Sequence, residues 1–221
     1  MTDFHTHILP ALDDGSRNCE ESAQMLKELY RQGVTVAVAT PHFYPMSTGP
    51  DRFFQKREES FSALKNFIIS NDSIPSIRLG AEVSYFDGIA DCGFLEKFII
   101  EGTNLILIEM PFCRWSPRMV DEIYEIKKNR GLTPLIAHID RYLSFNSNAF
   151  YIFDPDKVLV QVNASACVKP FLRIKTLKMI KEGRIHALGS DCHNMTDRAP
   201  NIGAANEYLK KKASQVSLLS L

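Results

Sequence analysis

Short apolar runs recur along this chain, and helical or loop-plus-helix sequence follows each of them. Seven such runs read as β-strands, at about residues 2–8 and at residues 34–39, 77–83, 104–108, 132–137, 157–162 and 185–189. Runs that are apolar on both faces are typical of parallel sheets with helices packed on either side. The alternation therefore predicts an α/β fold. A seven-stranded, TIM-barrel-like (β/α) barrel is the first interpretation, and an open doubly wound sheet, which lacks its G-x-G-x-x-G turn here, is the second.

Helix signals lie between these runs. We predict helices over residues 20–32, 51–70, 93–100, 117–130 and 169–182, and a final helix that opens at Pro200. Asp51 and Ser116 are the expected N-caps of two of them, and Gly131 is an expected stop. The length of 221 residues suits a single α/β barrel, which commonly has about 200–250 residues. No linker-like segment divides the chain, so residues 1–221 are expected to form one domain.

Composition excludes several classes of function. Lys and Arg together number 26, as do Asp and Glu, so the formal net charge is zero and nothing overall favours nucleic acid or anionic membranes. No apolar run approaches the length of a membrane span, and no signal peptide is visible. The five scattered cysteines form no C-x-x-C pair, which suits free thiols in the cytoplasm. We therefore expect a cytoplasmic protein that neither binds nucleic acid nor inserts into a membrane.

Polar side chains follow the predicted strands at the point where each strand ends. Positions i and i+2 of an extended chain point to one side, so His5 and His7 project together, and Asp191 and His193 repeat this spacing. In a barrel the carboxyl ends of all strands converge. The candidate metal ligands collected in this way are His5, His7, Asp14, His42, Glu82, Glu109, His138, Asp191 and His193. The sixth histidine, His186, begins a strand and is interpreted as a packing residue.

The donor types indicate which ions such a site would hold. Mixed imidazole and carboxylate ligands suit Mn, Fe or Zn. Nine candidates are too many for one ion and suit two or three. Four of them are carboxylates, so two divalent ions would leave the site neutral and three would leave it positive. A positive multinuclear site favours a phosphate and can clamp both oxygens of an in-line displacement.

These residues fall within motifs that resemble a known family. The chain is similar to the PHP (polymerase and histidinol phosphatase) superfamily, and most similar to the bacterial tyrosine-protein phosphatases that act beside capsule and exopolysaccharide tyrosine kinases. The matching segments are His5-Thr6-His7-Ile8-Leu9-Pro10 with Asp13-Asp14-Gly15, Ala39-Thr40-Pro41-His42, Gly80-Ala81-Glu82, Ile108-Glu109-Met110-Pro111-Phe112, Ala137-His138-Ile139-Asp140-Arg141-Tyr142 and Ser190-Asp191-Cys192-His193-Asn194, followed by Arg198. They keep the family's order over nearly the whole chain.

The resemblance implies more than the spacing does. It implies a distorted seven-stranded barrel whose nine residues above ligate three ions, usually manganese. It implies that Arg141 and Arg198 hold the substrate phosphate, which fits the bidentate geometry of guanidinium. It also implies a phosphotyrosine protein as substrate, in particular the tyrosine kinase that controls capsule synthesis. Relatives usually continue with a further helical segment after the Arg198 helix, so the stability or the oligomer contacts of this chain are expected to differ from theirs.

Several alternatives stay open at this point. Cys167 and Arg173 fit C-x5-R, the signature of cysteine-dependent tyrosine phosphatases, although the loop lacks glycines and contains Pro170. A histidinol-phosphate or other small-molecule phosphatase would use the same metal site, and a metal-stabilised docking module without catalysis is a further alternative. Five aromatic residues near the strand ends either form a wall for a phenyl ring or pack the barrel rim: Phe43, Tyr44, Phe112, Trp115 and Tyr142.

Overall fold

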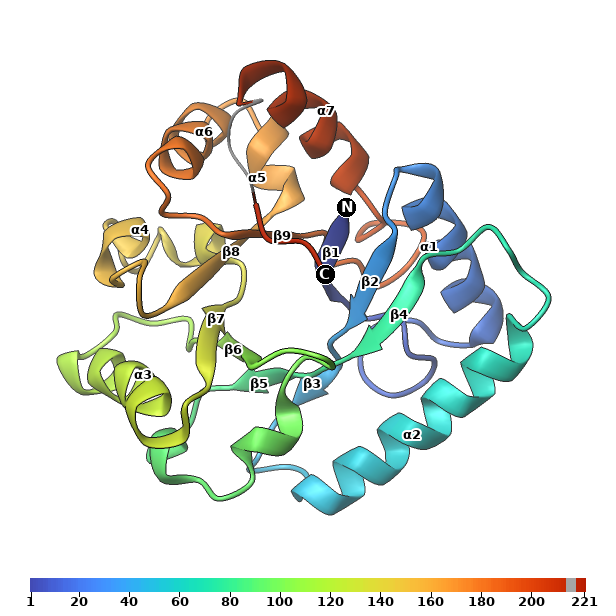
Figure 1. Ribbon diagram of the computed structural model, residues 1–221, viewed down its shortest axis with the longest axis horizontal. Helices are drawn as coiled ribbons and strands as arrows, with labels where there is room; N and C mark the ends of the chain where they lie inside the picture. The colour runs from blue at the N-terminus through green and yellow to red at the C-terminus, as the bar shows by residue number, and fades with distance from the viewer. Residues whose placement is uncertain (214–217) are drawn as a thin grey trace.

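A curved, entirely parallel β-sheet wall organises the molecule, with helices around it (Figure 1). The computed structural model describes residues 1–213 and 218–221. One sheet has the strand order β1 (Thr2–Thr6), β2 (Val36–Ala39), β4 (Ser76–Leu79). The other has the order β3 (His42–Phe43), β5 (Glu82–Ser84), β6 (Leu105–Glu109), β7 (Thr133–Ile136), β8 (Leu159–Asn163), β9 (Ala187–Gly189). The α/β prediction is confirmed.

The strand count differs from the expected seven, because the described residues contain nine strands. The predicted strand at 77–83 is divided at Gly80 and Ala81 into β4 and β5. The run at 34–39 is followed, after Thr40 and Pro41, by the additional strand β3. Before the breaks β2 pairs with β4, and after them β3 pairs with β5. The two breaks therefore lie side by side in the sheet. Pro41 has no N–H to donate, which favours an interruption of the ladder there.

The two sheets meet where β1 lies beside the segment after β9. Thr6 and Cys192 form a parallel bridge, and His7 N–H donates to the Cys192 carbonyl over 2.9 Å. Asp3, fully buried in β1, accepts from Ser190 N–H at 2.8 Å and from His5 N–H at 3.2 Å. Burial raises the pKa of this carboxyl to about 6. Asp3 thereby connects the first strand to the last, and sequence analysis did not single it out.

The helices largely follow their sequence signals. They are α1 (Cys19–Arg31), α2 (Pro50–Phe67), α3 (Pro117–Arg130), α4 (Ala149–Ile152), α5 (Ala164–Val168), α6 (Arg173–Lys181) and α7 (Ile202–Lys212), with 3-10 turns at Ile89–Asp91, Leu95–Phe98 and Ile139–Tyr142. The Ser116 cap is confirmed, since its side chain accepts from Met119 N–H. Gly131 ends α3 in the left-handed conformation, at φ 69°.

Four helix predictions needed correction. Asp51 does not cap α2, because Pro50 already occupies the first turn and Gly49 is the cap residue without a side-chain bond. Residues 93–100 contain only a 3-10 turn, and α7 begins at Ile202 rather than at Pro200. The predicted helix 169–182 begins at Arg173, after the separate helix α5 and the turn that contains Pro170.

Two clusters of buried apolar residues stabilise this arrangement. The larger one lies between the sheet and the helices and includes Leu26 and Leu29 of α1. The smaller one includes Phe4, Val38 and Leu107, together with Leu135 and other residues outside the helices. Because it draws on strands of both sheets and on no helix residue, it lies inside the curve of the sheet. This inner cluster supports the polar side chains at the carboxyl ends of the strands.

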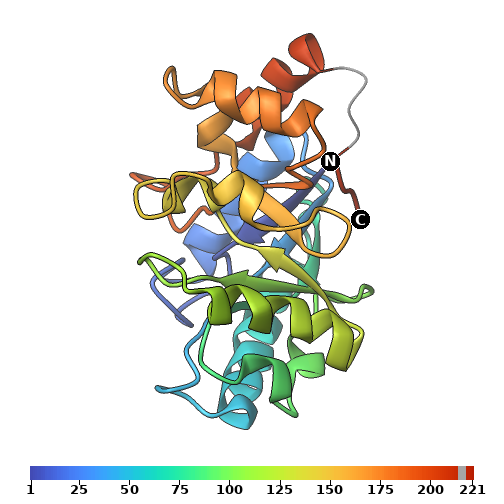
Figure 2. The same ribbon diagram turned by 90° about the vertical axis from the view of Figure 1, so that its left-hand side faces the viewer.

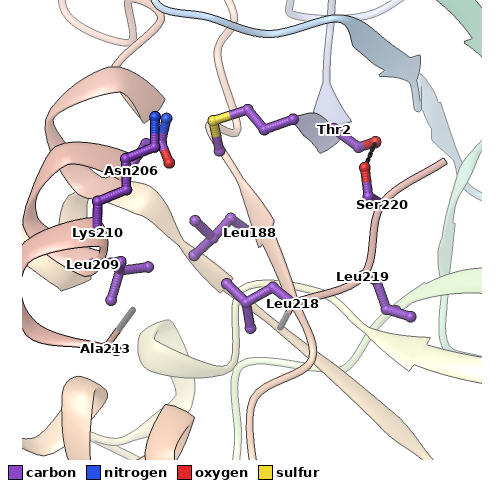
Figure 3. A pocket seen from close by; sticks show the side chains of 10 residues that line it. Thr2, Leu188, Asn206, Leu209, Lys210, Ala213, Leu218, Leu219 and Ser220 are labelled. Carbon is purple, nitrogen blue, oxygen red and sulfur yellow. Dashed lines mark hydrogen bonds between the residues drawn. The ribbon is translucent and has the colours of Figure 1, made fainter. Parts of the chain in front are cut away.

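The first and last described residues lie together where β1 begins, at the end of the sheet opposite to the carboxyl ends of the strands (Figures 1 and 2). The N–H of Leu221 donates to Thr2 Oγ1 over 2.8 Å, and the Leu219 N–H donates to the His186 carbonyl. Figure 3 shows the small pocket between these residues and α7, into which the Leu188 and Leu209 side chains project. Within residues 1–213 and 218–221, no helix is long and apolar enough to span a bilayer.

Candidate metal centre

The nine candidate ligands all converge at the carboxyl ends of the strands. Their donor atoms fall into four overlapping groups, within each of which the atoms lie no more than 4.8 Å apart. These groups are His7–Asp14–His42–His193, His5–Glu82–His138, His5–His7–Asp191 and His42–Glu82–Glu109. Only Asp14 is well exposed, with 62% of its side chain accessible. The structure therefore brings together every side chain that the sequence placed at this site.

Glu82 lies at the middle of the cluster and is almost completely buried. Its Oε2 is 3.2 Å from His5 Nε2 and 2.9 Å from His42 Nδ1, and its Oε1 is 2.9 Å from His138 Nε2. Burial alone raises the pKa of Glu82, but the surrounding imidazoles outweigh burial and hold it well below its usual value. A buried carboxylate surrounded by imidazoles is the donor set that divalent cations select.

The spacing of donor atoms fits a set of bound cations. Metal–ligand distances of about 2.0–2.2 Å place neighbouring ligand atoms roughly 2.8–3.6 Å apart. His5 Nε2 and His7 Nε2 are 3.1 Å apart, and His7 Nε2 is 3.5 Å from Glu82 Oε2. Among the described residues, four buried side-chain atoms of candidate ligands lie close to other groups of the cluster but make no hydrogen bond of good geometry: His42 Nδ1, Glu82 Oε2, His138 Nδ1 and His193 Nε2. Unpartnered buried donor atoms are costly unless something else satisfies them. The residues present therefore fit divalent ions.

Local electrostatics favours positive charge at this position. Burial lowers the pKa of His7, but the carboxylates of Asp13 and Glu82 outweigh burial and raise it to about 10. His193 behaves differently, because burial and the positive charges of His7 and Arg198 lower its pKa to about 4. The His193 Nδ1–H donates to the Asp191 carbonyl at 3.0 Å, which leaves Nε2 as the free lone pair. Neutral imidazole is the form that binds metal.

Two candidate ligands have strained backbones. His138 has φ 29° and Asp191 has φ 55°, in the left-handed region that non-glycine residues rarely occupy. Such conformations cost of order 1–3 kcal/mol each and cluster at functional sites. Nearby, Gly189 lets β9 approach closely, because an added Cβ would lie 2.6 Å from the His5 Cβ. The fold thus stabilises an unfavourable backbone where these side chains must point inward.

Asp13, which was not predicted as a site residue, supports the His7 imidazole and the backbone of His42. Asp13 Oδ2 accepts from His7 Nδ1 at 2.8 Å and from the His42 backbone N–H at 3.0 Å. Its pKa is lowered, because the ionised His7 and these hydrogen bonds outweigh the effect of burial. A carboxylate on the distal nitrogen fixes the ring orientation of a metal-binding histidine. The paired acids in Asp13-Asp14-Gly15 were the available signal.

A second supporting set comes from β8, which contributes no candidate ligand. Gln161 Oε1 accepts from the His138 backbone N–H and lies 3.4 Å from His5 Nδ1. Gln161 Nε2 donates to Asn163 Oδ1 at 3.1 Å, and Asn163 Nδ2 donates to Asp191 Oδ2 at 3.2 Å. These two amide side chains therefore orient three candidate ligands, His5, His138 and Asp191. Nothing in an apolar strand run indicates such a role for Gln161.

Replacing Gln161 by leucine is expected to weaken the affinity for divalent metal ions by about 10–100-fold, the usual effect of losing an outer-shell partner. Leucine keeps the volume but removes the hydrogen bonds to His138, His5 and Asn163. Competition titration with a chelator measures the affinity, and a thermal melt without metal checks that the variant is folded. Gln55→Leu on the exposed face of α2 is the control. An unchanged affinity in Gln161→Leu would show that the amide has no orienting role.

The two arginines named by the resemblance lie beside the cluster. Arg198 Nη2 is 2.8 Å from Asp191 Oδ1, and Arg141 Nη1 is 3.5 Å from Asp191 Oδ2. The Arg141 guanidinium lies over the Phe112 ring, 4.7 Å from its centroid. Both arginines line a polar cavity of about 540 Å³ together with Lys169 and other polar residues. They are partly exposed, and so are free to contact an anion.

The five aromatic residues divide into two groups. Phe43, Trp115 and Tyr142 are buried and pack the rim. Tyr44 and Phe112 remain 44% and 42% exposed, and their rings stack on the imidazoles of His42 and His138 respectively. Only these two of the five can therefore contact a phenyl ring.

Known proteins are similar to this chain over most of its length. The sequence model of the family described as "Capsular polysaccharide synthesis, CpsB/CapC" matches residues 1–220. CapC of Staphylococcus aureus is 31% identical over 210 residues, which are 90% of this chain and 79% of CapC. The tyrosine-protein phosphatase YwqE of Bacillus subtilis (strain 168) is 27% identical over 222 residues, which are 96% of this chain and 85% of YwqE.

A solved structure is similar over almost the whole chain. It belongs to the crystallographic work on YwqE from Bacillus subtilis and CpsB from Streptococcus pneumoniae, described there as metal-dependent tyrosine phosphatases. The TM-score is 0.82 at 25% sequence identity, and the match covers 97% of this chain and 88% of the other. Because the family model spans residues 1–220, this protein belongs to the CpsB/CapC family of capsular polysaccharide synthesis.

Proposed function

We propose that this protein is a metal-dependent protein-tyrosine phosphatase and that residues 1–221 act as one catalytic domain. Its nine clustered side chains would hold two or three divalent ions, Mn²⁺ in the first place and Fe or Zn otherwise. The observation that carries this proposal is the convergence of nine imidazole and carboxylate groups beside two arginines. The strands, counted by position around the wall, would form a distorted seven-membered barrel.

When bound, the ions would supply Lewis-acid stabilisation of the phosphoryl group and an activated water. The protein's own groups do the rest. Arg141 and Arg198 bind the phosphate oxygens, and Asp191 holds both guanidinium groups at the edge of the cluster. Tyr44 and Phe112 flank the leaving group. Tyrosine, with a pKa of about 10, leaves with less help from an acid than an alkyl alcohol does.

The natural substrate proposed is phosphotyrosine in a protein, in particular the tyrosine kinase that controls capsule or exopolysaccharide synthesis. Membership of the CpsB/CapC family supports this substrate. The protein would act in the cytoplasm. The alternative, a histidinol-phosphate or other small-molecule phosphatase, would use the same metal cluster.

Steady-state kinetics on a substrate panel tests the proposal. Phosphotyrosine peptides, phosphoserine peptides and histidinol phosphate are compared with Mn²⁺, Zn²⁺, Mg²⁺ or a chelator. We expect the highest kcat/KM on phosphotyrosine peptides with Mn²⁺, and no turnover with the chelator. Preference for histidinol phosphate would support the alternative. If no substrate is hydrolysed with any of the metals, the remaining interpretation is a metal-stabilised docking module without catalysis.

A cysteine-dependent mechanism would need Cys167 as its nucleophile. Cys167 is buried, and burial raises the pKa of its thiol to about 12. Such a thiol is not a nucleophile at neutral pH. Cys167→Ser is therefore expected to leave kcat/KM on phosphotyrosine peptides within about twofold of wild type, since it touches no part of the proposed mechanism. Loss of turnover in a folded variant that still binds Mn²⁺ would reassign the reaction to the C-x5-R segment.

A further inference from the structure

The turn between α5 and α6 and the outer side of α6 carry a local excess of positive charge. Residues 168–184 contain six cationic residues and one acidic residue, although the whole chain is neutral. The cationic residues are Lys169, Arg173, Lys175, Lys178, Lys181 and Arg184, and the acid is Glu182. A net charge of zero therefore conceals a basic surface. We call residues 168–181 the basic turn–helix surface.

Large apolar side chains project from the same surface. Phe171 is 99% exposed and Ile174 is 72% exposed. The opposite side of α6 faces the core, where Met179 and Ile180 are buried. Residues three and four apart share one side of a helix, so Ile174 and Lys178 project outward together. Two large apolar side chains this exposed, three residues apart in the chain and among cationic residues, form the apolar part of a surface that could contact a partner.

The shape of this surface favours a lipid bilayer over a peptide. Phe171 protrudes almost free of neighbours, so it forms a tip and not one wall of a groove. A bound peptide needs a groove or an exposed sheet edge, whereas α6 is a short helix on the outside of the molecule (Figure 2). Basic residues around protruding apolar side chains match the headgroup region of an anionic membrane.

The surface also lies near the candidate metal centre. Lys169, at its start, lines the same polar cavity as Arg141 and Arg198. The α5–α6 segment follows β8, whose carboxyl end carries Asn163. Contact through Phe171 would therefore bring the catalytic end of the molecule close to the bilayer.

We propose that the basic turn–helix surface binds reversibly to anionic membranes. Phe171 and Ile174 enter the headgroup layer, and the lysine and arginine side chains around them bind lipid phosphates. With so few apolar residues the contact is weak and depends on charge, so it should be lost at high salt.

Co-sedimentation with large vesicles tests the proposal. Wild-type protein is mixed with vesicles of phosphatidylglycerol and phosphatidylcholine in equal parts, or of phosphatidylcholine alone, at low and at high salt. We expect at least about tenfold tighter binding to the anionic vesicles at low salt, and loss of this preference at high salt. Equal binding to both vesicle types, or binding to neither, would overturn the proposal.

Two variants separate the apolar and the electrostatic contributions. Phe171→Ser with Ile174→Ser, and Lys175→Glu with Lys178→Glu, should each reduce binding to anionic vesicles about tenfold or more. The matched control is Ile69→Ser with Lys65→Glu at the end of α2, where Ile69 is likewise 80% exposed. Binding reduced as much by the control, or unchanged in both test variants, would refute a specific membrane surface.

Two further measurements exclude competing explanations. Hydrolysis of p-nitrophenyl phosphate should be unchanged in all variants, so a failed membrane test stays distinguishable from a failed phosphatase assignment. A test variant that binds vesicles normally but turns over acidic phosphotyrosine peptides more slowly would show that the surface docks protein instead. A changed oligomeric state in size-exclusion chromatography, without vesicle binding by wild type, would show that it joins copies of this chain.

Discussion

Replacing Glu82 by glutamine is expected to remove most bound metal and to lower kcat/KM on phosphotyrosine peptides by about 10³-fold, since metal stabilisation contributes several kcal/mol and each tenfold in rate is about 1.4 kcal/mol. Glu82 lies within 3.2 Å of His5, His42 and His138. The substitution removes its negative charge and turns an amide donor toward imidazole nitrogens. The change is nearly isosteric, so the protein should still fold.

Elemental analysis of the purified variant measures bound metal, and initial rates over a Mn²⁺ titration measure activity. Glu122→Gln is a matched control, because Glu122 is also buried but contacts Tyr85, Gly88 and Arg118 on the side of α3. It should keep wild-type metal content and rate. Full metal content and activity in Glu82→Gln would contradict the proposed centre.

The second large effect concerns the phosphate clamp. Arg198→Met is expected to lower kcat/KM on phosphotyrosine peptides by about 10²–10³-fold, as the removal of one transition-state donor typically does. Arg198→Lys should recover only part of this loss, because an ammonium cannot bind two oxygens in the guanidinium geometry. Bound metal should be unchanged in both variants, since Arg198 offers no lone pair to an ion.

The control is Arg130→Met, because Arg130 is also partly buried but donates to Ala90 and Asp91 away from the centre. The double variant with Arg141→Met should show less than the sum of the single free-energy losses, because both arginines contact Asp191. If Arg198→Met loses metal as well as rate, then Arg198 acts through Asp191 and not on the phosphate.

Much of this site was predictable because it depends on strand geometry. The i, i+2 spacing of His5 and His7 and of Asp191 and His193, together with their position after apolar runs, placed them at one end of a parallel sheet. The structure brings these four side chains together. The backbone strain at His138 and Asp191 was not predictable, because neither residue type signals a left-handed conformation.

The supporting residues were harder to predict for a physical reason. Gln161 within β8 is fully buried, and only the folded structure shows that its amide is satisfied by His138, which follows β7, and by Asn163 on its own strand. The strand divisions depend on how β2 and β4 pair, which is a property of two segments and not of either one. Phe43 and Tyr44 are adjacent in sequence but differ in exposure. Phe43 ends β3 and is buried, whereas Tyr44 is the first residue after the strand and stacks on the His42 imidazole.

The meeting of the two chain ends has a practical consequence. Leu221 donates to Thr2 at the beginning of β1, and the strand carries the chain about 16 Å from Thr2 to His7. An affinity tag, a fluorescent reporter or a surface-immobilisation linker fused at either end would therefore project away from incoming substrate. One short connector could also join both ends, which would let new ends be opened in an exposed loop such as residues 69–73 for circularly permuted variants.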